Sequence, residues 1–193
     1  MTQQRGHIVE SVKEGIVASI KGTGEVVNAV VDTVSGTLTN AIRATGAVGA
    51  TLTGTVSDVL RGAIQGTADV GGDVGAAAKG GVLGVIRGTR EAGVEATETI
   101  GTSARAIVKS AAEVGGDLGT AARHAVEGAI AGARDAGLDA ETAATAAASG
   151  AIKGAGEISS TAVEQVRNAV TGVIAGVKVV VKEPFRKDER KAS

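Results

Sequence analysis

Isoleucine recurs every 22 residues through this chain of 193 residues, with no insertion or deletion across eight units. The register contains Ile20, Ile42, Ile64, Ile86, Ile130, Ile152 and Ile174, and Val108 fills the remaining position. Twenty-two residues are two elevens, and eleven residues make three helical turns at about 3.67 residues per turn. Apolar residues three and four positions apart extend each isoleucine into a stripe. The period therefore predicts an all-α array of helical repeats.

The repeat sets the expected domain organisation. We expect a helical array over residues 8–181, an N-terminal tail over 1–7 and a charged C-terminal tail over 182–193. Residues 68–111 align without a gap with 112–155, so the units of 22 are also paired as 44.

The same alignment suggests where the chain turns. It repeats Gly71-Gly72 as Gly115-Gly116, each pair followed by an aspartate that can cap the next helix. We therefore predict long helices folded back at hinges formed by Gly71, Gly72, Gly115 and Gly116. One continuous helix and a helix-turn in every unit are the alternatives. The constant unit length argues against a turn in every unit, because loops generally tolerate insertions.

Glycine pairs with the spacing G-x-x-x-G flank most of the isoleucines. Such pairs let two helix backbones approach closely. Each glycine in a helix interior costs about 0.5–1 kcal/mol relative to alanine, so packing must offset the cost of so many. We expect these residues, with the isoleucines, to pack helices together: Gly62, Gly66, Gly84, Gly88, Gly128, Gly132, Gly150, Gly154, Gly172 and Gly176.

Charged residues also follow the repeat. Acidic residues four apart, such as Glu113 and Asp117, form a ridge that is mildly unfavourable in an isolated helix. Arginines on another flank, including Arg61 and Arg105, are placed to pair with this ridge from an adjacent helix. The simpler reading is a solvated face with weak ion pairs. The 20 basic and 21 acidic residues give a net charge of -1, which argues against a nucleic acid partner.

Sequence patterns for catalysis are absent. The two histidines, His7 and His124, do not have metal-ligand spacing, and the sequence contains neither a phosphate-binding loop nor a nucleophile elbow. We expect a protein that is not an enzyme, with no cofactor, no metal site and no small-molecule substrate. The chain has no stretch of 18 uncharged apolar residues, so we expect a cytoplasmic protein, either free or peripheral to a membrane or granule.

The Thr- and Gly-rich units resemble those of known repeat families. The relevant segments are VESVKEGIVASIKGTGEVVNAVV (9–31) and SGTLTNAIRATGAVGATLTGTVSD (35–58). They resemble the eleven-residue repeats of synucleins, perilipins and group 3 late-embryogenesis-abundant proteins. The resemblance implies helices that fold on lipid droplets, membranes or drying surfaces. This chain has more glycine, fewer lysines and an acidic ridge, and these differences weaken an anionic-lipid interpretation.

These observations favour a non-enzymatic scaffold that self-associates through amphipathic Gly/Ala/Ile helices. Its expected partner is a second copy of itself. The first alternative is a coat on a lipid, membrane or granule surface, and the second is a chain that protects against desiccation. Pro184 is expected to stop the last helix, and Phe185, the only aromatic residue, is a candidate anchor in the tail.

Overall fold

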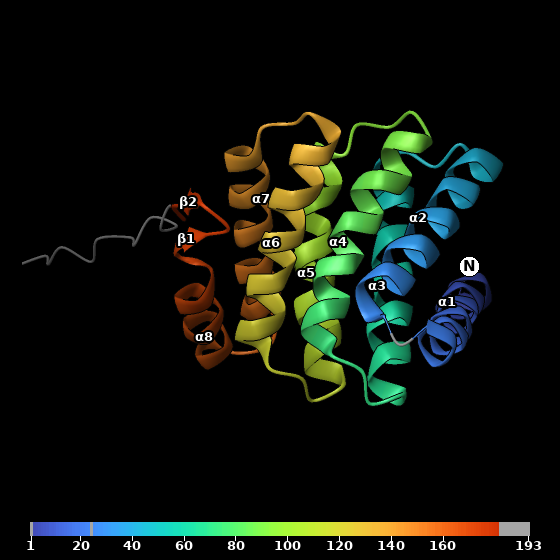
Figure 1. Ribbon diagram of the computed structural model, residues 1–193, viewed down its shortest axis with the longest axis horizontal. Helices are drawn as coiled ribbons and strands as arrows, with labels where there is room; N and C mark the ends of the chain where they lie inside the picture. The colour runs from blue at the N-terminus through green and yellow to red at the C-terminus, as the bar shows by residue number, and fades with distance from the viewer. Residues whose placement is uncertain (1, 24, 182–193) are drawn as a thin grey trace, which may run out of the picture.

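A computed structural model describes residues 2–23 and 25–181 of the protein, together with the side chains of 6–22 and 25–181. The described chain forms eight α-helices followed by one β-hairpin (Figure 1). The helices are α1 (Thr2–Thr23), α2 (Val26–Thr45), α3 (Gly49–Asp69), α4 (Val74–Glu91), α5 (Thr97–Glu113), α6 (Leu118–Ala136), α7 (Ala140–Gly156) and α8 (Ser160–Val170). The hairpin strands are β1 (Gly172–Ile174) and β2 (Val177–Val179), paired antiparallel.

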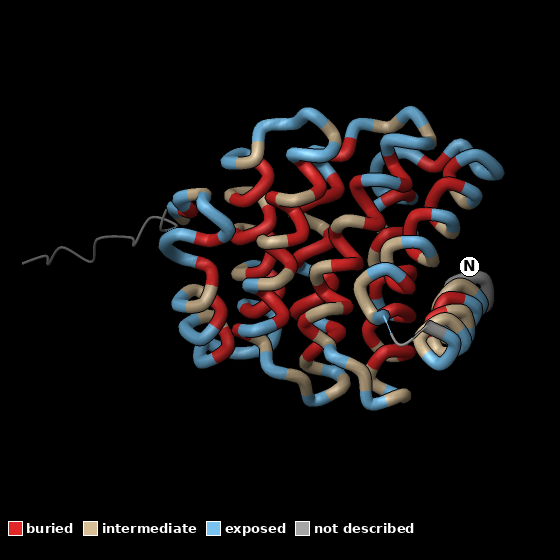
Figure 2. The backbone as a smooth tube through the Cα atoms, in the orientation of Figure 1, coloured by how far each residue is buried: buried red, intermediate tan, exposed pale blue. Residues whose placement is uncertain are grey.

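The helices stack in two layers. Odd-numbered helices form one layer and even-numbered helices the other, and each helix contacts the helix two positions away as well as its neighbours in sequence (Figure 1). Consecutive helices run in opposite directions, so helices within a layer are parallel. Figure 2 shows the buried residues concentrated between the layers, with the exposed residues in the turns and on the outer faces.

The all-α class predicted from the repeat is confirmed. The preferred topology was different, because no described helix extends across two units. Breaks occur at the Gly-Gly sites and also between α4 and α5 and between α6 and α7. The arrangement is the alternative with a helix and a turn in every unit.

The turns explain why the unit length never changes. Gly71, Gly93, Gly115 and Gly137 lie 22 residues apart, and each has a positive φ between 68° and 78° that ends its helix. After each of these glycines, the next amide donates a hydrogen bond back into the preceding helix, as from Gly72 to the Thr67 carbonyl at 2.9 Å. A turn of another length would shift the following helix out of register with its layer.

Short polar side chains start several of the helices. The Asp73 carboxylate accepts hydrogen bonds from the amides of Gly75 and Ala76, and Asp117 and Asp139 each accept one from the amide three residues later. Ser159 caps α8 in the same way. These caps satisfy amides that have no partner within the helix.

The apolar stripe lies mainly in the core. Ile42, Ile64, Ile86, Ile130 and Val108 are buried, whereas Ile20 near the N-terminal end and Ile152 in α7 are half-buried. Alanines fill much of the remaining space between the layers, especially along α7. Small side chains allow the layers to approach closely, which compensates for the lack of large aromatic residues.

The two ends of the array differ from the sequence-based boundaries. The first helix begins at Thr2, although residues 1–7 were expected to be a tail. The helical array ends at Val170, although it was expected to continue to 181. The following hairpin buries Ile174 and Val179 against the last helices. The expected C-terminal tail, 182–193, with Pro184 and Phe185, lies outside the described residues.

Candidate interaction surfaces

The glycine pairs lie where a helix contacts the helix two positions earlier. A Cβ atom added at Gly62 of α3 would lie 2.5 Å from the Val9 carbonyl oxygen of α1. A Cβ atom added at Gly66 would lie 2.8 Å from the Lys13 carbonyl oxygen. Real Cβ contacts are not this short, so only glycine allows α3 to approach the α1 backbone so closely.

The same contact is repeated along both layers. A Cβ atom at Gly84 or Gly88 of α4 would lie within 3 Å of a backbone carbonyl oxygen of α2. Gly128 of α6 meets the α4 backbone, and Gly150 and Gly154 of α7 meet the α5 backbone. Gly132 instead faces the Ile86 side chain, whose Cδ1 atom would be 2.7 Å from an added Cβ. The glycine face of each of these helices is therefore occupied within the chain.

Two of the expected packing glycines do not pack helices. Gly172 and Gly176 lie in the hairpin, with φ of 112° and 81°. Their expected role is wrong because the helix ends at Val170 and they serve the hairpin's backbone geometry. The β-branched run Val179-Val180-Val181 was the available sequence signal for a strand.

Between α3 and α5 the glycine pair is replaced by Ala106 and Ser110. A polar cavity of about 240 Å³ lies there. Its lining includes Arg61 and Arg105 with several hydroxyl side chains. The bulkier residues at the pair positions coincide with the opening between these two helices.

Ion pairs connect helices within a layer. Arg61 Nε of α3 lies 2.8 Å from Glu113 Oε2 of α5, and Lys13 Nζ lies 2.8 Å from Asp69 Oδ2. Arg105 also pairs with Glu157, which Lys109 reaches at 2.7 Å. The acidic ridge thus meets basic residues of adjacent helices, as the sequence allowed. These pairs are exposed and each contributes little to stability.

The hydrogen bond from Lys109, followed by that from Arg105, holds the pKa of Glu157 below its ordinary value. Hydrogen bonds from Thr120 and Thr142 likewise lower the pKa values of Asp117 and Asp139. A carboxylate with a lowered folded-state pKa contributes stability above its unfolded pKa and loses that contribution as the pH falls through the folded value.

We therefore expect the free energy of unfolding to change little from pH 7 to about pH 5 and to fall below about pH 4, where these carboxylates become protonated. Urea unfolding at a series of pH values measures this. Glu157→Gln should flatten part of the acid limb, whereas Glu141→Gln, at an exposed position in α7, serves as the matched control. A stability that rises on acidification would contradict the assignment.

A groove crosses the outer face of the even layer. It has a volume of about 620 Å³ and is lined by residues of α2, α4 and α6. Val31, Leu83 and Ile86 contribute apolar surface. Arg87 forms ion pairs at its rim with Asp32 and Glu91. The groove's charges are thus largely balanced by their own neighbours.

The N-terminal end of the array carries an uncovered helix face. Ala18 and Gly22 of α1 stand 44 residues before Gly62 and Gly66, and both are exposed. No atom lies within 4 Å of a Cβ added at Gly22, or at Gly36 of α2. At the opposite end the hairpin contacts α6 and α7 (Figure 1). The array is therefore covered by the hairpin at one end and open at the other.

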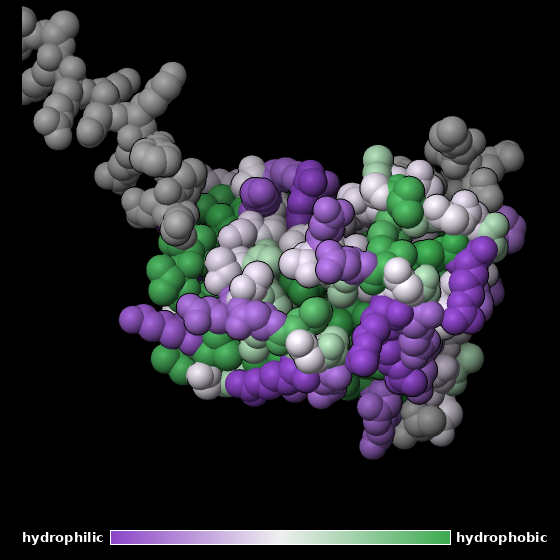
Figure 3. Space-filling view, turned by 90° about the horizontal axis from the view of Figure 1, so that it is seen from above, coloured by the Kyte–Doolittle hydropathy of each residue, from purple (hydrophilic) through white to green (hydrophobic). Residues whose placement is uncertain are grey.

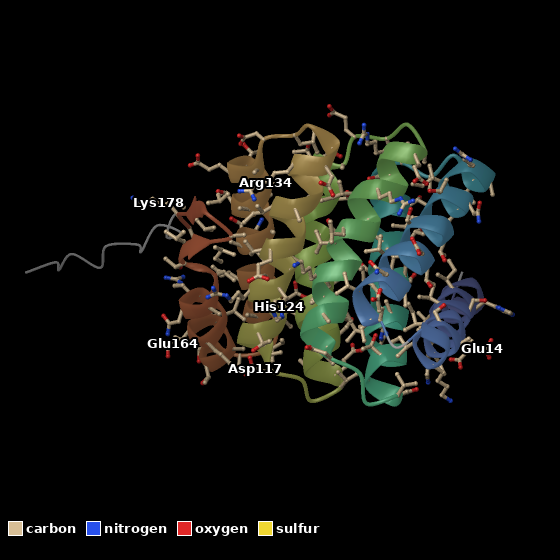
Figure 4. The ribbon with its side chains drawn as sticks, in the orientation of Figure 1. Glu14, Asp117, His124, Arg134, Glu164 and Lys178 are labelled. Carbon is tan, nitrogen blue, oxygen red and sulfur yellow. The ribbon has the colours of Figure 1, made fainter. Side chains whose placement is uncertain are left out.

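The histidines lie apart, with His7 exposed on α1 and His124 in α6 facing α4 (Figure 4). A Cβ added at Gly75 of α4 would collide with the His124 ring, whose buried Nδ1 has no hydrogen-bond partner. Among the described residues there is no group of three potential metal ligands. None of the described helices has the length and apolarity needed to cross a membrane.

Viewed from above, the turn-bearing end of the molecule shows hydrophobic patches separated by charged side chains (Figure 3). Val48, in the turn before α3, is 68% exposed. The comparisons with known proteins add no relative to this description, because no family model and no curated protein matches the chain. The fold defines an all-α protein built as a two-layered stack of helices.

Proposed function

We propose that this protein is a non-enzymatic scaffold that self-associates and presents a two-layered stack of helices. The observation that carries the proposal is the open N-terminal end. There α1 exposes Ala18 and Gly22, at the positions that glycine pairs use in the internal contacts between helices. An uncovered face of this kind fits another folded surface at close range.

The burial of the isoleucine stripe supports a scaffold over a lipid coat. A lipid-binding amphipathic helix inserts its apolar face among acyl chains. Here Ile64, Ile86 and Ile130 face the core of the chain itself, so binding lipid through the stripe would require the layers to separate. Desiccation protection of the kind implied by the resemblance would require a free chain without this packing.

Three measurements on the full chain test the proposal. Circular dichroism in buffer should show high helicity without lipid, and vesicle flotation should leave the protein unbound. Sedimentation equilibrium should give a mass that rises with concentration above the monomer value of 18.8 kDa. A random-coil spectrum that becomes helical only with vesicles would favour the lipid coat. A monomer at every concentration would exclude self-association.

A further inference from the structure

We infer that the partner at the open end is a second copy of this chain, bound through an antiparallel contact between the two α1 helices. The inference rests on the proposed self-association and names the surface and geometry that it uses. It is carried by the exposed face of α1, the charges on that face and the covering of the opposite end of the array.

The exposed side chains of α1 lie on one face. Glu14, Ala18 and Lys21 follow the three- and four-residue spacing that aligns side chains on a helix, and each is exposed. Figure 4 shows Glu14 projecting from α1 at the edge of the molecule, away from the other helices. The buried face of α1, with Val12 and Ile16, packs on its own chain. The exposed face is thus free to meet another molecule.

The charges on this face are complementary to themselves under a two-fold axis. Glu14 and Lys21 are seven residues apart, about 10 Å along the helix, and Ala18 lies next to their midpoint. When two copies of α1 cross antiparallel at Ala18, each Glu14 faces the Lys21 of the other copy. Among the described residues, neither side chain has an ion-pair partner within its own chain. A parallel contact would bring like charges together.

Small residues allow close contact where the two helices would cross. Ala18 and Gly22 project little or no side chain, and nothing of the same chain lies within 4 Å of a Cβ added at Gly22. In α3 the corresponding glycines bring two helix backbones into direct contact. The same helix surface at the open end can therefore approach another helix as closely.

The other end of the array disfavours a head-to-tail partner. There the hairpin lies on α6 and α7, with Ile174 and Val179 buried, and Arg134 of α6 donates a hydrogen bond to the Ala175 carbonyl at 3.1 Å. A second copy would have to displace this hairpin to continue the stack. A symmetric pair of open ends instead closes after two copies, as in most soluble homo-oligomers.

Charge reversal tests the contact. Glu14→Lys and Lys21→Glu should each weaken dimerisation about tenfold or more, because each places like charges together at two symmetric sites. The double variant, Glu14→Lys with Lys21→Glu, restores opposite charges and should recover the dimer. Sedimentation equilibrium measures the dissociation constants, and circular dichroism checks that each variant remains folded. Both side chains are exposed, so the fold should not change.

Cross-linking tests the position of the axis. The chain contains no cysteine, so Ala18→Cys introduces a single thiol beside the proposed two-fold axis. Oxidation should produce a disulfide-linked dimer from Ala18→Cys and little from Thr161→Cys, an exposed control in α8 at the opposite end. An oligomer unaffected by both charge reversals, or equal cross-linking of the two variants, would overturn this contact while leaving self-association intact. A wild-type monomer would overturn both.

Discussion

Replacing Gly150 with alanine should lower the free energy of unfolding by about 3 kcal/mol. The added Cβ atom would collide with the Gly101 carbonyl oxygen of α5, and the carbonyl carbon and Cα of Gly101 also lie within 2.8 Å. These are backbone atoms, so relief requires α7 to move away from α5. Alanine favours a helix over glycine, and the expected loss is therefore opposite in sign to the change in helix propensity.

The matched control is Gly36→Ala in α2. This glycine is exposed, and nothing lies within 4 Å of its added Cβ. Only the backbone term should remain, so we expect a gain of about 0.5–1 kcal/mol. Urea unfolding followed by circular dichroism measures both variants. Equal effects of the two substitutions would show that the glycine pairs do not determine helix spacing.

The sequence predicted the helices and their packing chemistry better than their connection. Period and glycine spacing indicated helices that meet through small residues, because both are local properties of one helix surface. The basic residues that meet the acidic ridge were also visible, with Arg61 and Arg105 placed on another flank. What the pattern lacked was the identity of the neighbour, since a contact with the helix two positions away depends on the turns.

The turns were misjudged for a physical reason. A constant unit length was taken as evidence for an unbroken helix, yet Gly93 and Gly137 end helices as Gly71 and Gly115 do. Each turn fixes the depth at which the next helix enters its layer, so stacked helices constrain turn length as strongly as a continuous helix would. The glycines spaced by 22 residues were the decisive signal.

The C-terminal hairpin was missed because the isoleucine register continues through it. Ile174 keeps the spacing of 22 residues and is buried, but it lies in β1. Burial at a repeated position therefore does not require the same secondary structure. The left-handed turn at Ala175 and Gly176, with φ of 46° and 81°, reverses the chain where another helix was expected.

Replacing Ile130 with alanine should cost about 2–5 kcal/mol of unfolding free energy. Ile130 is fully buried in α6, a helix that contacts both layers, and the shortened side chain would leave a cavity in a core of small residues. Stacked repeats are stabilised mainly by their neighbours, so weakening α6 should loosen α4 and α8 as well. Hydrogen exchange should therefore show faster exchange in these helices. Val48→Ala, at an exposed position, should change stability by less than about 0.5 kcal/mol. An equally small effect at Ile130 would mean that the layers are not held together by the isoleucine stripe.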